Sequence, residues 1–202
     1  MKRLLRLAVP AALALSLGAC SISGLLGGGK VPPTLLTLTP ETAAPGEFSR
    51  AANAGEAVTI QTPVIAKELR TIRVPVQVTP TDVAYIEDVQ WVDTPDRLFQ
   101  DLLAETLRRR TNRVVLAPDQ ATLDPGLIVT GQLLRFGFDE AEQAVIVRYD
   151  GALSTTGGTR VETRRFEARV SARGDSTIGP YLNRAANQVA LEVATWIGGS
   201  RL

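Results

Sequence analysis

Three long segments in the second half of the chain are predicted strands, and the last two carry apolar side chains at every second position. They span residues 126–138, 144–153 and 161–172. In the middle segment Val145 and Val147 fall on one side, and charged residues fall on the other. This alternation has the period of a β-strand that buries one side only. Strands that keep one polar side are typical of an antiparallel sheet with one face in water.

Shorter strand patterns surround these segments. Residues 57–62, 71–78 and 83–86 precede them, and residues 113–116 lie just upstream of the first long strand. Pro75 falls inside the second of these short strands. Because proline has no backbone N–H to donate, we expect an edge position or a bulge at Pro75.

Two helices are predicted. The first begins at Thr94 as N-cap, with Pro95 as its first helical residue, and ends in Arg108–Arg110 with Asn112 as a left-handed C-cap. The second covers residues 178–197. Both helices place apolar residues three and four positions apart: Leu98, Phe99, Leu102, Leu103 and Leu107 in the first, and Leu182, Ala185, Ala186, Val189, Val193, Trp196 and Ile197 in the second. Two helices on one face of a mostly antiparallel sheet predict a two-layer α+β domain.

The amino terminus has the pattern of a secretory signal peptide. Basic residues at positions 2, 3 and 6 precede an apolar stretch over residues 7–17. That stretch is too short for a transmembrane helix, which needs about 20 apolar residues. It has the length of the apolar region of a signal peptide. We therefore expect residues 1–19 to be removed.

The apolar stretch ends in Leu17-Gly18-Ala19-Cys20, which resembles a bacterial lipobox. Cleavage is expected between Ala19 and Cys20, with a diacylglycerol and a fatty acid attached to Cys20. Three acyl chains anchor a protein stably, since each buried CH₂ contributes about 0.8 kcal/mol. Ser21, in place of an aspartate, resembles the address for the periplasmic face of the outer membrane and disfavours the inner membrane.

Residues 20–55 are expected to form the lipidated terminus and a flexible tether. Glycines stand at positions 24 and 27–29, and a second stretch rich in Ala, Pro and Gly follows at residues 39–55. Residues 34–38 could form a short strand between the two stretches. The folded domain is predicted over residues 56–202.

Composition restricts the chemistry that the chain can perform. The 202 residues contain no histidine, and Cys20 is the only cysteine. The commonest general base and the commonest metal ligand are therefore missing, and an internal disulfide cannot form. The acidic run from Asp139 to Glu142 lies between two predicted strands, where exposed acids are usual. We therefore expect no enzyme activity, no cofactor and no metal.

Charge argues against nucleic acid as a partner. The chain has 22 basic and 21 acidic residues, and loss of the three basic residues of the signal peptide leaves 19 basic residues. The mature chain then has a net charge near −2. Proteins that bind nucleic acid usually carry a clustered basic excess.

Aromatic residues are candidates for contact with a partner protein. Trp91 stands just before the first helix, where it fits either a hydrophobic staple or a partner contact. Tyr85, Phe136 and Phe138 are further candidates. Trp196 lies on the apolar stripe of the second helix, so we expect it in the core.

These features together resemble the ABC-type transport auxiliary lipoproteins. The resemblance covers about residues 17–198. It rests on these pieces: Leu17-Gly18-Ala19-Cys20, Leu35-Leu36-Thr37-Leu38, Val83-Ala84-Tyr85-Ile86-Glu87-Asp88-Val89-Gln90-Trp91, Pro95, Leu98, Leu102 and Leu107, the strand from Leu127 to Asp139 with Arg135-Phe136-Gly137-Phe138, Ala185-Ala186, and Trp196-Ile197. Leu35 and Leu36 depart from the family pattern, which has a tyrosine nearby.

The resemblance implies a role and a set of partners. Such lipoproteins face the periplasm and assist lipid transporters that contain a mammalian-cell-entry (MCE) domain protein, a permease and an ATPase. We expect this chain to act by protein–protein contact in the transport of phospholipid or hydrophobic solutes. Two alternatives stay open: a carrier that holds an acyl chain between sheet and helices, and an outer-membrane assembly lipoprotein. Self-association into a homo-oligomer also stays open.

Overall fold

We describe the structure from a computed structural model. It covers residues 32–44, 46, 49–53, 55–121, 126–155, 160–173 and 177–200. The chain divides into residues 1–31 and a compact unit from Pro32 to Leu202, and only this unit is described. The predicted signal peptide, with Ala19, and the predicted lipidation site Cys20 lie outside the described residues.

The sheet is built around one long strand, β6. The strands are β1 Val58–Ile60, β2 Val64–Ile65, β3 Arg73–Gln77, β4 Val83–Gln90, β5 Val115–Leu116, β6 Leu127–Asp139, β7 Ala144–Thr155 and β8 Val161–Ser171. Along one edge, β6 pairs with β7 over its whole length, and β7 pairs with β8. Both of these long ladders are antiparallel, as the alternating sequence pattern predicts.

The other edge of β6 is shared by three short strands. β1, β2 and β3 pair with it one after another, each parallel to β6. β5 extends this edge beside β1, and β4 extends it beside β3. The sheet is therefore mixed, with the long ladders antiparallel and the short pairings mostly parallel. The α+β class predicted from the sequence is confirmed.

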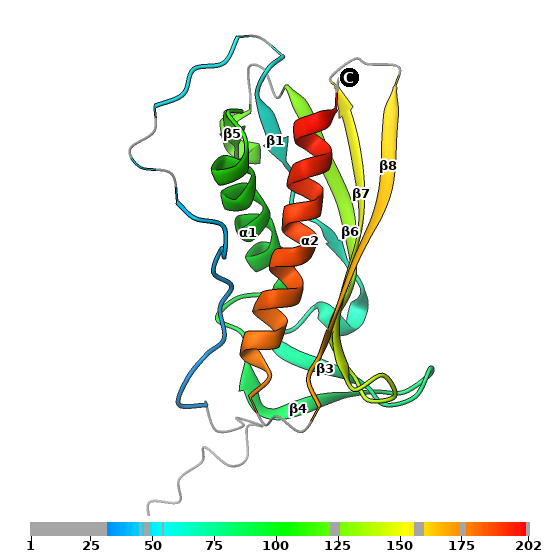
Figure 1. Ribbon diagram of the computed structural model, residues 1–202. Coiled ribbons are helices and arrows are strands. Elements are labelled where there is room, and N and C mark those ends of the chain that lie inside the picture. The colour runs from blue at the N-terminus through cyan, green and yellow to red at the C-terminus, as the bar shows by residue number, and fades with distance from the viewer. Residues whose placement is uncertain are drawn as a thin grey trace, which may run out of the picture. The chain divides into compact units, whose positions relative to one another are not determined.

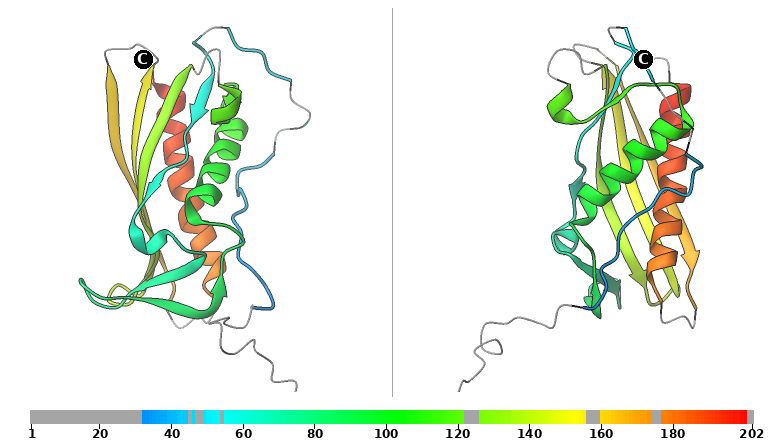
Figure 2. Two further views of the ribbon diagram at one scale, coloured as in Figure 1. Left: turned by 180° about the vertical axis from the view of Figure 1, so that it is seen from behind. Right: turned by 90° about the vertical axis from the view of Figure 1, so that its left-hand side faces the viewer.

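Two α-helices cover one face of the sheet, as Figures 1 and 2 show. They are α1 Pro95–Arg110 and α2 Gly179–Gly199, and short 3₁₀ turns occur at Lys67–Leu69 and Pro118–Gln120. The predicted apolar stripes of both helices are buried against the sheet, except that Trp196 is half-buried. Burial of such stripes is the main source of helix stability in a domain of this kind.

A row of aromatic rings fills the space between sheet and helices. Phe99 of α1 lies 5.2 Å from Tyr149 of β7, which lies 6.5 Å from Phe166 of β8. Phe166 in turn lies 5.5 Å from Trp196 of α2. Gly131 makes room for this row, because a Cβ there would lie 2.3 Å from the Tyr149 hydroxyl oxygen. The interior along this row is therefore packed with side chains.

Pro75 lies at a bulge. The register between β3 and β4 shifts between Arg73 and Pro75, and β3 is flanked on both sides, by β4 and β6. Of the two positions that the sequence allowed for this proline, the structure selects the bulge. Gly137 of β6 approaches the same point so closely that a Cβ would lie 2.3 Å from the Pro75 carbonyl oxygen.

Two local expectations were wrong. The strand predicted at residues 83–86 continues to Gln90, with Asp88 in the left-handed region at φ 55°. Helix α1 ends at Thr111 in extended conformation, so Asn112 is not a left-handed C-cap. The Thr111 side chain donates a hydrogen bond to the Leu107 carbonyl and thereby satisfies one of the last carbonyls of the helix.

The folded unit begins earlier than predicted. Residues 32–44, which we call the N-terminal strap, belong to it, although the sequence placed them in a tether. The strand expected at residues 34–38 is reduced to one parallel bridge between Leu36 and Trp91. From that bridge the strap runs along the two helices toward their carboxyl ends (Figure 2).

Candidate interaction surfaces

Side chains of both helices hold the strap by its backbone. Asn187 of α2 donates to the Thr39 carbonyl and accepts from the Glu41 amide, at 2.9 and 2.8 Å. Asn183 accepts from the Thr39 amide, and Arg109 of α1 donates to the Thr42 carbonyl. Asn187 is buried beside the apolar stripe of α2, and sequence reasoning missed this contact.

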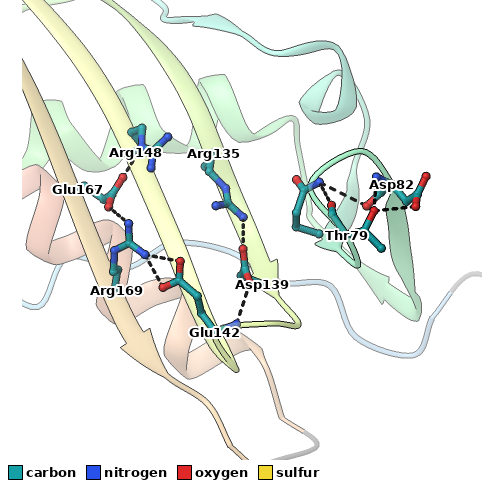
Figure 3. A network of polar contacts seen from close by, with 9 residues as sticks. Thr79, Asp82, Arg135, Asp139, Glu142, Arg148, Glu167 and Arg169 are labelled. Carbon is teal, nitrogen blue, oxygen red and sulfur yellow. Dashed lines mark hydrogen bonds and ion pairs between the residues drawn. The ribbon is translucent and has the colours of Figure 1, made fainter.

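The sheet face opposite the helices carries alternating charges. Arg148 of β7 pairs with Glu167 of β8, Glu167 pairs with Arg169, and Arg169 pairs with Glu142 in the β6–β7 turn, as Figure 3 shows. Cross-strand pairs of opposite charge stabilise neighbouring strands by a few tenths of a kcal/mol up to about 1 kcal/mol. This face therefore presents charges that already have partners on the same face.

Asp139 was expected in a solvated turn, and that expectation was wrong. The residue is buried, its carboxylate lies 2.8 Å from Arg135, and it also accepts a hydrogen bond from the Glu142 amide. Burial alone would raise the pKa of Asp139. Arg135 and the backbone amides outweigh that effect, so the pKa lies below its usual value. Asp139 thus closes the β6–β7 turn.

Another ion pair, between Arg165 and Asp150, lies on the same face of the sheet, nearer to the other end of β7. Arg165 donates two hydrogen bonds to the Asp150 carboxylate, at 2.7 and 2.6 Å. These bonds lower the pKa of Asp150. Since the two oxygens of one carboxylate face two nitrogens of one guanidinium, the pair has the bidentate geometry that fixes orientation best.

A ribbon of two strands, β3 and β4, projects from one end of the domain (Figures 1 and 2). Its tip exposes Val78 and Val83, each 40% accessible. Tyr85 is half-buried on this ribbon, with its hydroxyl donating to the Glu68 carbonyl and the Arg73 guanidinium 4.5 Å from its ring centre. The ribbon thus combines apolar and charged groups at the surface.

The predicted contact residues separate into two pairs. Trp91 and Phe136 are each only 1% exposed, and their rings pack at 5.1 Å, so they belong to the core. Tyr85 and Phe138 keep part of their surface accessible. Contact of any of these residues with a partner stays a prediction, and the accessible pair is where a test should begin.

Within the described ranges, no three His, Cys, Asp or Glu side chains lie close enough together to hold a metal ion. No helix in the described part of the chain is both long and apolar enough to span a membrane.

Comparison with protein families decides the classification. The family model for the ABC-type transport auxiliary lipoprotein component matches residues 36–194. The chain belongs to this family. The match includes both helices up to Ala194 and every strand, and it begins at Leu36, within the strap. No curated protein matches the chain.

Solved structures share the fold of this auxiliary component. A Xanthomonas campestris protein of the DUF330 family is 16% identical, with a TM-score of 0.69, and the match covers 82% of this chain and 94% of that one. An uncharacterized protein is 12% identical, with a TM-score of 0.59 and coverage of 74% and 94%. A hypothetical protein from Chlamydia trachomatis is 10% identical, with a TM-score of 0.50 and coverage of 71% and 95%. At these identities the likeness concerns the fold alone.

Family membership has direct consequences. An auxiliary lipoprotein component of ABC-type transport is a protein of the cell envelope, and its family is one of transport accessories and not a known enzyme family. The resemblance identified from the sequence is thereby confirmed.

Proposed function

We propose that this auxiliary lipoprotein serves an ABC transporter built around an MCE-domain protein. It contacts that protein and its permease and ATPase, and it thereby assists the transport of phospholipid or hydrophobic solutes across the envelope. The lipid on Cys20 holds it at the periplasmic face of the outer membrane. The observation that carries the proposal is the family match over residues 36–194, together with the lipobox ahead of it.

The surface of the domain supports a role by contact. The β3–β4 ribbon projects from the body and exposes Val78 and Val83, and β4 has no strand beside its outer edge among the described residues over residues 83–89. An open strand edge with apolar neighbours is a common docking surface for another chain. Tyr85 and Phe138 lie close to this end and add partly exposed aromatic rings.

Site-specific photo-crosslinking tests the proposal in cells. A photoreactive amino acid at Tyr85 is expected to crosslink to the MCE component, and the same amino acid at Gln188, exposed on α2, serves as the matched control. Mass spectrometry identifies the crosslinked protein. A β-barrel protein in its place would favour the assembly alternative, and a product at twice the chain's mass would show self-association. Absence of any transporter subunit from products at both positions would contradict the proposal.

Removal of the anchor tests the localisation. Cys20→Ala should release a folded protein from the membrane, since Cys20 is the expected point of lipid attachment. Fractionation after a high-salt wash measures this, with circular dichroism of the released protein as the check on folding. A variant that stays with the membrane fraction after the wash would disprove the lipid anchor, and sucrose-gradient separation of the wild-type membranes identifies which membrane holds it.

A further inference from the structure

Strand β8 breaks its own pattern in the half that lies beside the end of α2 (Figure 1). Phe166, Ala168 and Val170 face the helices and are buried. Continuation of the same alternation toward the start of the strand places Arg164 and Glu162 on the helix side as well. Charged residues therefore occupy positions of the strand that would otherwise belong to the core.

These positions line an open hollow of about 730 Å³ between β8 and the last turns of α2. We call it the α2–β8 groove. Its lining includes Arg160, Glu162, Arg164, Leu191, Glu192 and Trp196. Its volume lies within the range of small-molecule sites, about 300–1,000 Å³.

The floor of the groove is apolar. Trp196 is half-buried and packs on Phe166 below it, at 5.5 Å between ring centres. Gly151 lets the indole lie on the sheet, since a Cβ there would be 3.3 Å from the ring. Leu191, at 39% exposure, leaves an apolar side chain uncovered beside it. An aliphatic chain laid along these two residues would remove them from water.

The rim carries two positive and two negative groups. Arg160 and Glu162 already form an ion pair at 2.6 Å. Arg164 lies over the Phe166 ring at 5.2 Å, and neither Arg164 nor Glu192 has an ion-pair partner among the described residues. A ligand with one negative and one positive group would supply partners to both, whereas a simple anion would supply only one.

We propose that the α2–β8 groove binds a zwitterionic phospholipid through one acyl chain. The chain lies along Leu191 and Trp196, the phosphate faces Arg164, and the ammonium group faces Glu192. This inference deepens the proposed function by placing a single transported lipid on the auxiliary component itself. It concerns a different surface from the β3–β4 ribbon, so its failure would leave the crosslinking test of the transporter contact unaffected.

Fluorescence quenching tests the groove directly, because the chain has two tryptophans and Trp91 is buried. The protein is the full mature chain with Cys20→Ala, which keeps its own acyl chains out of the assay. In this chain Trp91→Phe leaves Trp196 as the only tryptophan. The probe is lysophosphatidylcholine with a dibrominated acyl chain, used below its micelle concentration. Saturable quenching of Trp196 is expected, with none from the unbrominated lipid.

Variants of the groove separate its floor from its rim. Leu191→Ser should weaken binding about fivefold, and Arg164→Ala or Glu192→Gln about threefold to tenfold. Val92→Ser, at a residue 55% exposed and absent from the groove lining, is the matched control and should bind like its parent. Dibrominated fatty acid should bind more weakly than the zwitterionic probe.

Several results would overturn the proposal. Quenching that rises linearly without saturation would show collision and not binding. Equal affinity for the fatty acid and the zwitterionic lipid would remove the role of the rim. If Leu191→Ser and Val92→Ser weaken lipid binding by the same factor, the lipid binds outside the groove. Circular dichroism of each variant confirms that the domain is folded.

Discussion

Trp91 offers a test of how the core beneath the β4–α1 junction is stabilised. The side chain is 1% exposed and packs on Phe136, yet its indole Nε1 has no hydrogen-bond partner among the described residues. Two effects therefore oppose each other at one residue. The ring contributes apolar burial, and the unpaired N–H reduces that contribution.

The two effects can be separated by two substitutions. Trp91→Ala removes the whole ring and should cost about 3–5 kcal/mol of unfolding free energy. Trp91→Phe loses part of the ring, at a cost of about 1–2 kcal/mol, but also removes a buried N–H whose lack of a partner costs about 1–3 kcal/mol. We therefore expect Trp91→Phe to lie within about 1 kcal/mol of the wild type.

Urea denaturation monitored by circular dichroism measures both values on the full mature chain with Cys20→Ala. In a domain of this size, 1 kcal/mol corresponds to a change of about 2–4 °C in Tm. Trp91→Leu and Phe136→Leu, alone and combined, complete a double-mutant cycle that should give a ring–ring coupling of about 0.5–1.5 kcal/mol.

One outcome would refute this reasoning. If Trp91→Phe lowers the unfolding free energy by more than about 2.5 kcal/mol, burial of the Nε1–H does not destabilise the fold, which means that this group has a hydrogen-bond partner. An unchanged slope of free energy against urea is required for the comparison, because a changed slope would show an altered denatured or native state.

Three further predictions concern the sheet, its turn and the strap. Gly137→Ala places a Cβ 2.3 Å from the Pro75 carbonyl oxygen, so it should cost about 1–3 kcal/mol and increase hydrogen exchange in β3 and β4. Because the pKa of Asp139 is lower in the folded chain than in the unfolded one, its ionised carboxylate stabilises the fold above the unfolded pKa, and this contribution is lost as pH falls through the folded pKa. Asp139→Asn should therefore be less stable than the wild type at pH 7, with the difference in urea midpoint shrinking below pH 4. Asn187→Ala should cost about 1–3 kcal/mol and increase hydrogen exchange at the Glu41 amide.

Matched controls keep these three predictions falsifiable. Gly46→Ala meets no atom within 4 Å and should leave stability nearly unchanged. Asp119→Asn alters an exposed carboxylate and should leave the urea midpoint at pH 7 nearly unchanged. Gln188→Ala changes the exposed neighbour of Asn187 and should not loosen the strap. A control that equals its partner variant in effect would contradict the corresponding prediction.

The sequence predicted the parts of the fold that depend on local periodicity. The long strands β7 and β8 follow from apolar residues at every second position, and both helices from apolar residues three and four positions apart. The parallel placement of β1, β2 and β3 along one edge of β6 could not be predicted, because strand pairing depends on distant contacts and not on local pattern. The strap was missed for the same reason, since the residue that anchors Thr39 is 144 positions away.

Whether a particular residue lies at the surface or in the core was harder to predict than the helices and strands. Trp91 and Phe136 carry the same apolar signal whether they face a partner or each other, and only the packing at 5.1 Å decides. Asp139 looked like any turn carboxylate until Arg135 was placed beside it. Arg164 could be interpreted only after the register of β8 was known. The register places this charged residue on the helix side of the strand, among buried apolar residues, and that position indicated the groove.

The bridge at Leu36 determines where mechanical load enters the domain. Any pull on the chain ahead of Pro32 meets first the two backbone hydrogen bonds at Leu36, which join it to Gln90 and Val92 at 2.8 and 2.9 Å. Gln90 is the last residue of β4, and Val92 follows it in the connection to α1, at the base of the projecting ribbon. Leu36 also packs against the core and lies next to Gly179 at the start of α2, so tension on this part of the chain would act on the end of β4 and the start of α2 together.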